Sequence, residues 1–305
     1  MHTGDAAVLR VKGTDLGLAM TIDCVGSYCA LDPAEGGRHA VAEAARNIAC
    51  SGAVPIGVTN CLNFGNPEKP DVFYMFEKCV TAMGDACRAF GLPITGGNVS
   101  FYNENPQGAI DPTPVIGMMG RFEDVTKQVT QWFKDEGDPV YLLGSIGDSI
   151  GASRYLAVVH GKKTGHVPKV DLDAERRLQE VLRSMADSRV LKSAHDCSDG
   201  GFAVALAECC FSGRTHEQKE RGCRVSLPGR GRLDARLFGE AAGRVILTVS
   251  PGRQAEAESL LKAAGLPFER IGTVGGSNLA IEGALDVAVA DLAEPFFTSI
   301  EKIMS

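Results

Sequence analysis

The first 60 residues combine a two-residue strand periodicity with a helical periodicity. Apolar and polar residues alternate over residues 9–12 and again over 18–22, and the Gly13-Thr14-Asp15 segment between them predicts a β-hairpin. Asp32-Pro33 is typical of a helix cap followed by proline in the first turn, and this helix is expected to end at Gly52. Its expected buried face consists of residues three and four apart, which are Val41, Ala44, Ala45 and Ile48.

The next 60 residues repeat this order of strand and helix. Residues 56–59 predict a strand, and a long helix follows, because apolar residues recur at three- and four-residue steps from Val72 to Phe90. Gly91 and Pro93 are expected to end that helix. A short strand at 94–95 and a further strand at 115–120 complete an α+β unit of strands and helices.

Two polar segments stand out in this unit, one from Thr59 to Pro67 and one from Ile94 to Asn103. Each begins where an apolar run stops and places short polar side chains beside glycine, which predicts two loops that present amides and hydroxyls to a ligand. The helix between them would bring the two loops side by side. Gly-Gly-Asn is also common turn chemistry, so a ligand site and a plain turn both remain open.

The chemistry of these segments suits a nucleotide and a metal ion. The carbonyl oxygen of Asn98 suits Mg²⁺ when phosphate and water complete its octahedron. Ser100, two residues further along an extended chain, projects to the same side and could donate to an anionic substrate. Asn60, after its own strand, could hydrogen-bond a nucleotide. The sequence contains no P-loop motif.

A change of composition over residues 122–138 places a domain boundary there, which gives an N-terminal domain of 1–135 and a C-terminal domain of 136–305. The second unit again alternates strands (140–143, 245–249, 270–274) with helices, one of them near 254–264, and the fold class is therefore α+β with two domains. In this unit His195 is expected to be a buried, hydrogen-bonded histidine. Asp196 and Asp199 resemble a paired-carboxylate site, but Asp199 is equally placed to cap a helix that begins at Phe202, and the cap is favoured. Glu240 is expected to pair with Arg244.

Composition excludes several classes of protein. The net charge of −7 argues against binding to the nucleic-acid backbone, which requires a basic face. The ten cysteines show no zinc-site spacing, and a chain of 305 residues needs no disulfide scaffold, so reduced thiols and a cytoplasmic protein are expected. Neither a signal peptide nor an apolar run of about 18 residues is present, and no membrane partner is expected.

Taken together, these segments resemble the C-terminal half of small-type phosphoribosylformylglycinamidine synthase, the formylglycinamide ribonucleotide amidotransferase. The resemblance covers essentially the whole chain and rests on segments in the same order: Asp32–Gly37, Ala42–Ser51, Thr59–Glu68, Thr95–Glu104, Pro112–Gly117, Ser193–Glu208 and Leu237–Val249. It implies a fold like that of aminoimidazole ribonucleotide synthetase, with an N-terminal and a C-terminal α+β domain. Two N-terminal domains of this type associate through their sheets into a barrel-like core, and the partner would be the first half of the same enzyme.

The resemblance also implies a reaction and its participants. In de novo purine biosynthesis this family uses ATP to phosphorylate the amide oxygen of formylglycinamide ribonucleotide, and ammonia then displaces phosphate to give the amidine. A glutaminase subunit and a small bridging subunit supply the ammonia. The cofactor expected beside ATP is Mg²⁺.

Carried onto this sequence, Asn60 and Gly97 match ATP contacts, Asn98 a magnesium ligand and Ser100 a substrate contact. Asn60 departs from the aspartate common in the family, and its amide keeps an acceptor but loses the charge. The family's catalytic histidine and most acidic metal ligands belong to the first half, so no catalytic residue is expected here. Ala241-Ala242 stand where the first half has a Ser-Gln pair that holds substrate.

The leading hypothesis is therefore one wall of an amidotransferase active site that does not turn over alone, because phosphoryl transfer needs cations on several sides. Two alternatives remain open. One is a self-sufficient homodimeric enzyme similar to aminoimidazole ribonucleotide synthetase, and the other is a non-catalytic nucleotide-binding lobe. Homodimerisation of the chain is also expected, since an exposed sheet would seek a partner.

Overall fold

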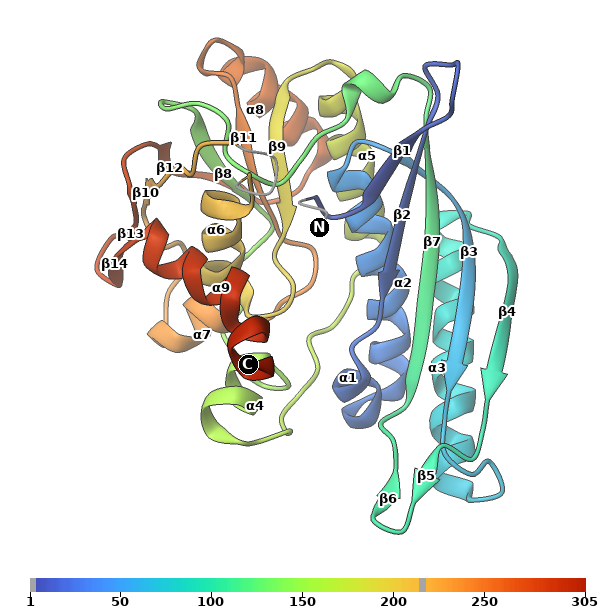
Figure 1. Cartoon of the computed structure of the whole chain (residues 1–305). Helices are drawn as coiled ribbons and strands as arrows, with labels where there is room; N and C mark the ends of the chain where they lie inside the picture. The colour runs from blue at the N-terminus through green and yellow to red at the C-terminus, as the bar shows by residue number, and fades with distance from the viewer. Residues whose placement is uncertain (1–3, 214–217) are drawn as a thin grey trace.

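The computed structural model describes residues 4–213 and 218–305 and shows two large β-sheets and one two-stranded sheet, with helices packed between and around the large sheets (Figure 1). Strands from residues 7–122 form the first sheet, and strands from residues 139–288 form the second. The predicted α+β class is confirmed. The predicted boundary at 135/136 falls in the connection between the last strand of the first sheet and the first strand of the second.

The first sheet has five strands, whose order across the sheet is β1 (Ala7–Arg10), β2 (Gly17–Asp23), β7 (Thr113–Phe122), β3 (Val54–Asn63) and β4 (Ile94–Ser100). Neighbouring strands are antiparallel except β3 and β4, which run parallel and are joined by the helix α3 (Pro70–Phe90). A separate hairpin, β5 (Glu104–Asn105) and β6 (Gly108–Ala109), extends beyond the end of the sheet (Figure 1).

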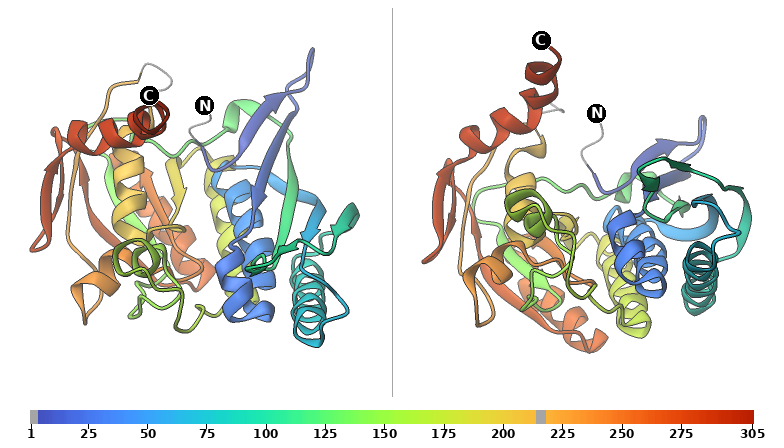
Figure 2. Two further views of the ribbon diagram at one scale, coloured as in Figure 1. Left: turned by 60° about the horizontal axis from the view of Figure 1, so that its bottom comes forward. Right: turned by 90° about the horizontal axis from the view of Figure 1, so that it is seen from below.

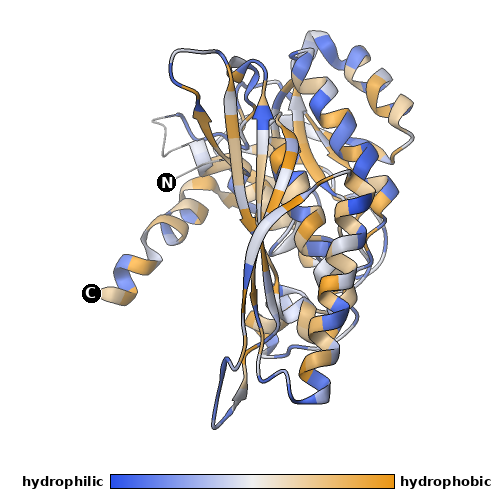
Figure 3. Ribbon diagram, turned by 90° about the vertical axis from the view of Figure 1, so that its right-hand side faces the viewer, coloured by the Kyte–Doolittle hydropathy of each residue, from blue (hydrophilic) through white to orange (hydrophobic). Residues whose placement is uncertain are grey.

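Helices cover only one face of the first sheet. They are α1 (Gly26–Leu31), α2 (Pro33–Cys50) and α3, and none of the described helices covers the opposite face, called the open face below, as Figure 3 shows from the side. Asp32 caps α2 as predicted, by accepting a hydrogen bond from the Glu35 N–H (3.1 Å). The predicted buried face of α2 is fully enclosed. Its small residues allow close approach: a side chain at Gly37 would come within 2.7 Å of the Cys79 carbonyl oxygen on α3.

The second sheet has seven strands, ordered β14 (Leu285–Ala288), β13 (Asn278–Ile281), β10 (Cys223–Val225), β12 (Phe268–Val274), β8 (Pro139–Leu143), β11 (Val245–Val249) and β9 (Leu191–Asp196). Every residue of β8 and β11 is buried, because helices lie on both faces. Tyr141 and Leu143 pack among α5 (Leu172–Asp187) and α8 (Gln254–Ala264), whereas Val140 and Leu142 pack among α6 (Gly201–Phe211), α7 (Leu233–Phe238) and α9 (Val289–Met304). Helix α4 (Arg154–His160) lies in the connection between β8 and α5.

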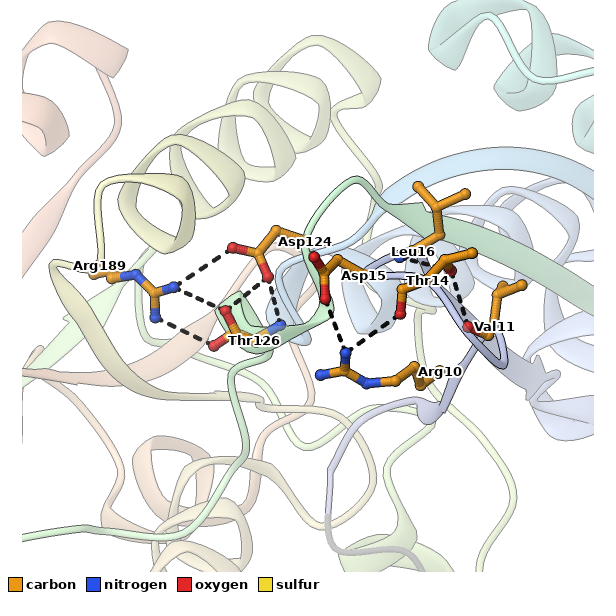
Figure 4. A network of polar contacts seen from close by, with 8 residues as sticks. All are labelled: Arg10, Val11, Thr14, Asp15, Leu16, Asp124, Thr126 and Arg189. Atoms are coloured by element: carbon orange, nitrogen blue, oxygen red, sulfur yellow. Dashed lines mark hydrogen bonds and ion pairs between the residues drawn. The ribbon is translucent and has the colours of Figure 1, made fainter.

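Polar contacts hold the connection that leaves the first sheet (Figure 4). Arg189, at the end of α5, donates to the hydroxyl of Thr126 (2.8 Å) and lies 3.6 Å from the Asp124 carboxylate. In the adjacent hairpin turn, Arg10 donates to Asp15 (3.0 Å). The backbone of Asp15 in turn accepts a hydrogen bond from Val125 (2.8 Å). These contacts attach the connection to the end of α5 on one side and to the β1–β2 hairpin turn on the other.

Most predicted elements are present, but the two polar loops are shorter than predicted. Residues 60–63 belong to β3 and residues 96–100 to β4, so the first part of each candidate segment is strand, and only residues 64–67 and 101–103 are loop. The reason is that β3 and β4 continue their ladder through these polar positions, up to the pairing of Asn63 with Ser100. The sequence pattern also did not predict α1, α4, α7 and α9. All ten cysteines are free, and no helix among the described residues is long and apolar enough to cross a membrane.

Candidate functional site

The four candidate residues lie on two adjacent parallel strands. In the register of β3 and β4, Asn60 pairs with Gly97, Cys61 with Asn98, and Asn63 with Ser100. The contact between Asn60 and Gly97 is close, because a Cβ atom at position 97 would lie 2.1 Å from the Asn60 Oδ1 atom. Glycine is therefore required opposite Asn60. The sequence correctly predicted that the two segments lie side by side, although they do so as strands.

The same register divides the four residues between the two faces of the sheet. Asn60 pairs on its other side with Ile116, which is fully buried beneath the helices, so Asn60 and Gly97 lie on the helix-covered face. Alternation along a strand places Asn98 and Ser100 on the open face. The structure thus brings all four residues together on neighbouring strands, but it places two on each face.

Aromatic packing fixes the ends of these strands on α3. Phe64 follows β3 and Phe101 follows β4, and both rings pack edge-on against Phe76 of α3, with centroid separations of 5.2 and 5.1 Å. Next to them, the Ser100 hydroxyl donates to the Asn103 side chain (3.1 Å), which itself donates to the Phe64 carbonyl (2.9 Å). Ser100 is therefore held in place by its own loop, and its oxygen is already part of a hydrogen-bond network.

Asn98 can supply one oxygen ligand to a metal ion. Its side chain is exposed, and an amide oxygen is a ligand type that Mg²⁺ accepts. Within the described part of the chain no group of three or more His, Cys, Asp or Glu side chains is arranged to hold a metal. The geometry thus fits a metal ion whose other ligands would be phosphate oxygens, water and groups from a second protein surface. This chain does not provide a complete set of ligands.

A second polar cluster lies between the two sheets, and of its members the sequence pattern indicated His195 but not Arg46 or Glu175. Arg46 of α2 forms buried ion pairs with Glu175 of α5 and with Asp196 of β9, the latter at 2.6 Å. The Asp5 carboxylate accepts from the Asp196 backbone N–H (2.8 Å) and contacts His195 Nδ1 (2.6 Å). One guanidinium therefore connects the N-terminal helix α2 to two elements of the C-terminal unit.

His195 is buried and hydrogen-bonded, as predicted. Its other ring nitrogen lies 2.9 Å from Glu208, and although burial opposes protonation, the two carboxylates raise the pKa of His195 well above its ordinary value. The carboxylates on either side therefore favour the protonated form of this histidine.

A third contact between the two units involves Glu240, and it corrects a prediction. Glu240 accepts hydrogen bonds from the Tyr28 hydroxyl (2.6 Å) and from the backbone N–H groups of Arg154 (2.7 Å) and Gly200 (2.9 Å), so it does not pair with Arg244. Arg244 instead donates to backbone carbonyls, including that of Gly239 (2.7 Å). Glu240 is satisfied by groups that are distant in sequence, which a local i,i+4 pattern does not reveal.

Asp199 does not cap α6, which corrects a second prediction. Gly200 is the N-cap residue, and Asp199 instead pairs with Arg154 at 3.0 Å on the surface. Gly200 adopts a left-handed backbone (φ +79°), which glycine tolerates, and occupies the N-cap position itself, so Asp199 lies one residue too early to be the cap. Ala241 and Ala242 line the narrow space beside Tyr28 and Glu240, so no polar side chain is offered at these two positions.

The buried carboxyls predict an unusual dependence of stability on pH. Burial raises the pKa of Glu175 to about 7, against the opposing effect of Arg46. The folded protein therefore takes up a proton near pH 7 that the unfolded chain takes up only near pH 4.5. We expect the free energy of unfolding to rise as pH falls from about 8 to about 6.5, by at most about 1.4 kcal/mol per pH unit per proton.

Urea unfolding at several pH values measures this slope. The raised pKa of Asp23, about 6, acts in the same direction, whereas His39, whose pKa burial lowers to about 4, opposes it below pH 6.5. Glu175→Gln should flatten the slope, and Glu180→Gln on the exposed side of the same helix should not. Equal slopes for the wild-type protein and Glu175→Gln would contradict the assignment.

A partial signal for this cluster exists in the sequence. Glu175 stands three and seven residues before Leu178 and Leu182, so it occupies a core position in the helical pattern of α5. Arg46 likewise lies among the mainly small and apolar residues of the second half of α2, and it is buried. A charged residue at a core position needs a charged partner, but the sequence does not show which one.

Two domains of one known protein family together match most of the chain. "AIR synthase related protein, N-terminal domain" matches residues 3–122, and "AIR synthase related protein, C-terminal domain" matches residues 135–282. The first match contains the whole first sheet, and the second contains β8 to β13. The sequence relatives are longer proteins.

The chain is 46% identical, over 310 aligned residues, to the phosphoribosylformylglycinamidine synthase subunit PurL of Anaeromyxobacter sp. (strain Fw109-5), with 99% of this chain and 40% of that protein covered. The subunit PurL of Thermomicrobium roseum is 43% identical over 97% of this chain and 40% of its own length. This chain therefore spans about two fifths of the length of these curated relatives.

Solved structures show the same fold at low sequence identity. "T. maritima PurL complexed with FGAR" superposes with a TM-score of 0.79 at 18% identity, covering 95% of this chain and 48% of that one. The protein tt0281 from Thermus thermophilus superposes with a TM-score of 0.66 at 21% identity, covering 92% of this chain and 90% of that one. With both domain matches in their expected order, the chain belongs to the AIR synthase related family.

Proposed function

We propose that this chain acts as the C-terminal half of a phosphoribosylformylglycinamidine synthase and contributes one wall of its active site. The observation that carries the proposal is the identity of 46% across 99% of the chain to a protein of that name. The fold supports it, because PurL of T. maritima has been solved with ATP and with FGAR and shares the architecture. The two alternative functions have no comparable support.

In the proposed reaction ATP phosphorylates the amide oxygen of formylglycinamide ribonucleotide, and ammonia displaces phosphate from the resulting iminophosphate. Asn60 and Gly97 would contact ATP, Asn98 would donate its amide oxygen to Mg²⁺, and Ser100 would contact the substrate. Mg²⁺ would neutralise charge on the phosphates as the phosphoryl group is transferred. The catalytic histidine and the acidic metal ligands would come from the first half of the enzyme, so we expect this half alone to show no turnover.

The proposed partners follow from the same assignment. The first half of the enzyme would cover the open face of the first sheet, and a glutaminase subunit with a small bridging subunit would supply ammonia in the cytoplasm. A solved assembly titled "Structure of PurLQS from Thermotoga maritima" contains a protein with this fold together with other subunits. When the chain is purified by itself, a second copy would take the place of the first half on the open sheet.

Removal of the Asn98 amide tests the proposed metal contact. In the complete enzyme we expect Asn98→Ala to lower kcat/KM by at least about tenfold, the scale of losses seen even for indirect metal partners. The loss of kcat/KM should diminish as the Mg²⁺ concentration is raised, because a site with weakened metal affinity still fills at a higher metal concentration. Asn105→Ala, in the exposed hairpin nearby, is the matched control. Unchanged kinetics for Asn98→Ala at limiting Mg²⁺ would remove Asn98 from the metal site.

A further inference from the structure

The C-terminal helix α9 carries an apolar stripe that is only half covered. Val289 and Ala293 are buried, and Phe297 packs against the same core, so the first half of the helix is anchored on α6. Steps of three and four residues continue this stripe through Ile300 to Ile303. Those two side chains are 77% and 82% exposed, because the helix runs beyond the body of the protein.

The distal turns of α9 have an organised polar side as well. Lys302 forms an ion pair with Glu294, and the Thr298 hydroxyl donates to the Glu294 carbonyl (2.8 Å). These contacts lie opposite the apolar stripe, so the helix is amphipathic over its exposed length. Met304, 81% exposed, and Phe296, 52% exposed, widen the stripe. A contiguous apolar helix face of this kind is typical of a surface that another protein covers.

The position of α9 indicates what covers it. In Figure 3, helices lie on one side of the first sheet, and α9 projects on the opposite side, toward which the open sheet face is turned. The view from below in Figure 2 agrees, with the end of α9 standing clear of the body on that side. A body seated on the open sheet would therefore lie next to the distal turns of α9.

The open sheet face is apolar and uncharged at its centre. A hollow of about 450 Å³ is lined there by residues that include Met20, Ile22, Ile56 and Met119, and none of its lining residues carries a charge. Ile22 is 77% exposed. A surface without charges can face an identical copy of itself without repulsion, and a twofold axis would place the same patch on both sides.

We infer that α9 is an interface arm: when a second copy of this chain docks sheet to sheet, the distal turns of each α9 pack against the other copy through Ile300, Ile303 and Met304. This inference rests on the sheet pairing given under Proposed function and adds a second contact to it. Each arm extends the buried surface beyond the sheet and brings an apolar stripe out of water.

Sedimentation velocity over a range of concentrations tests the arm. The variant with both Ile300→Glu and Ile303→Glu should dimerise at least tenfold more weakly than the wild-type chain, whereas Glu301→Gln on the same turn should not differ from it. Ile22→Lys, on the sheet, should also weaken the dimer. Because all of these side chains are exposed in one copy, circular dichroism and the thermal midpoint of the monomer should not change.

Hydrogen exchange locates the contact directly. Amides of residues 298–304 should exchange more slowly at concentrations that favour the dimer, and Ile22→Lys should abolish that protection. If Ile22→Lys disrupts the dimer while the double variant dimerises normally, the arm is overturned and the sheet pairing stands. If the wild-type chain remains monomeric at its highest soluble concentration, both the arm and the homodimer are overturned. Neither outcome bears on the enzymatic proposal, which is tested by the kinetics of Asn98→Ala.

Discussion

Arg46→Met is expected to lower the free energy of unfolding by about 3–5 kcal/mol at pH 8, the scale measured when one partner of a buried ion pair is removed. Arg46 is the cation between Glu175 and Asp196, and all three side chains are almost completely buried. Without the guanidinium, two carboxylates would remain in a water-poor junction. Since typical proteins are stable by about 5–15 kcal/mol, this one substitution would remove a large share of the total.

Urea unfolding measures the loss, and two further variants show its cause. Arg176→Met, which removes an exposed arginine from an ion pair with Glu180, should cost no more than about 1 kcal/mol. Adding Glu175→Gln to Arg46→Met should recover part of the stability, because a buried glutamine needs neither a cation nor an added proton, whereas the buried carboxyl needs one or the other. A loss for Arg46→Met no greater than that for Arg176→Met would show that the buried pairs do not hold the two units together.

Gly97→Ala should have the largest effect at the candidate site. The added methyl group would lie 2.1 Å from Asn60 Oδ1 and 2.8 Å from the Asn60 backbone oxygen, so either the side chain or the strand must move. We expect a stability loss of about 1–3 kcal/mol, as in other overpacked sites. Under the proposed function, ATP affinity measured by calorimetry in the complete enzyme should fall at least tenfold.

Gly96→Ala provides a matched control one residue away. A Cβ atom at position 96 meets no atom within 4 Å, so this variant should keep both stability and ATP affinity. The double variant Asn60→Ala with Gly97→Ala should regain stability, because the closest clash is with the Asn60 amide, but it should not regain ATP affinity. Wild-type affinity in Gly97→Ala would contradict the proposed role of this strand pair.

The regular elements could be predicted because their signals are local. The buried face of α2 follows from residue spacing alone, and Asp32 identifies its start. The limits of α8 at Gln254 and Ala264 agree with the prediction for the same reason. A helix is determined largely by residues within one or two turns of each other, and such residues are close together in the sequence.

The extent of β3 and β4 could not be predicted in this way. Gly96-Gly97-Asn98 has turn composition, yet its backbone is extended because the neighbouring strand supplies hydrogen bonds along the whole segment. The cluster around Arg46 has the same origin, since its partners lie 129 and 150 residues away in the chain. Contacts of such separation depend on the assembled fold, and a single sequence shows only that a charged residue occupies a core position.

The position of β4 at the edge of its sheet has a consequence for ligand geometry. One side of this strand pairs with β3, and within the five-stranded sheet no strand lies beyond its other side. Asn60 and Gly97 face one side of the sheet while Asn98 and Ser100 face the other. A single ligand that contacts both pairs would have to pass around the outer edge of β4, which is the rim of the sheet, from one face to the other. Under the proposed function, phosphoryl transfer would then take place at that rim, where a second protein can approach from outside without displacing any strand.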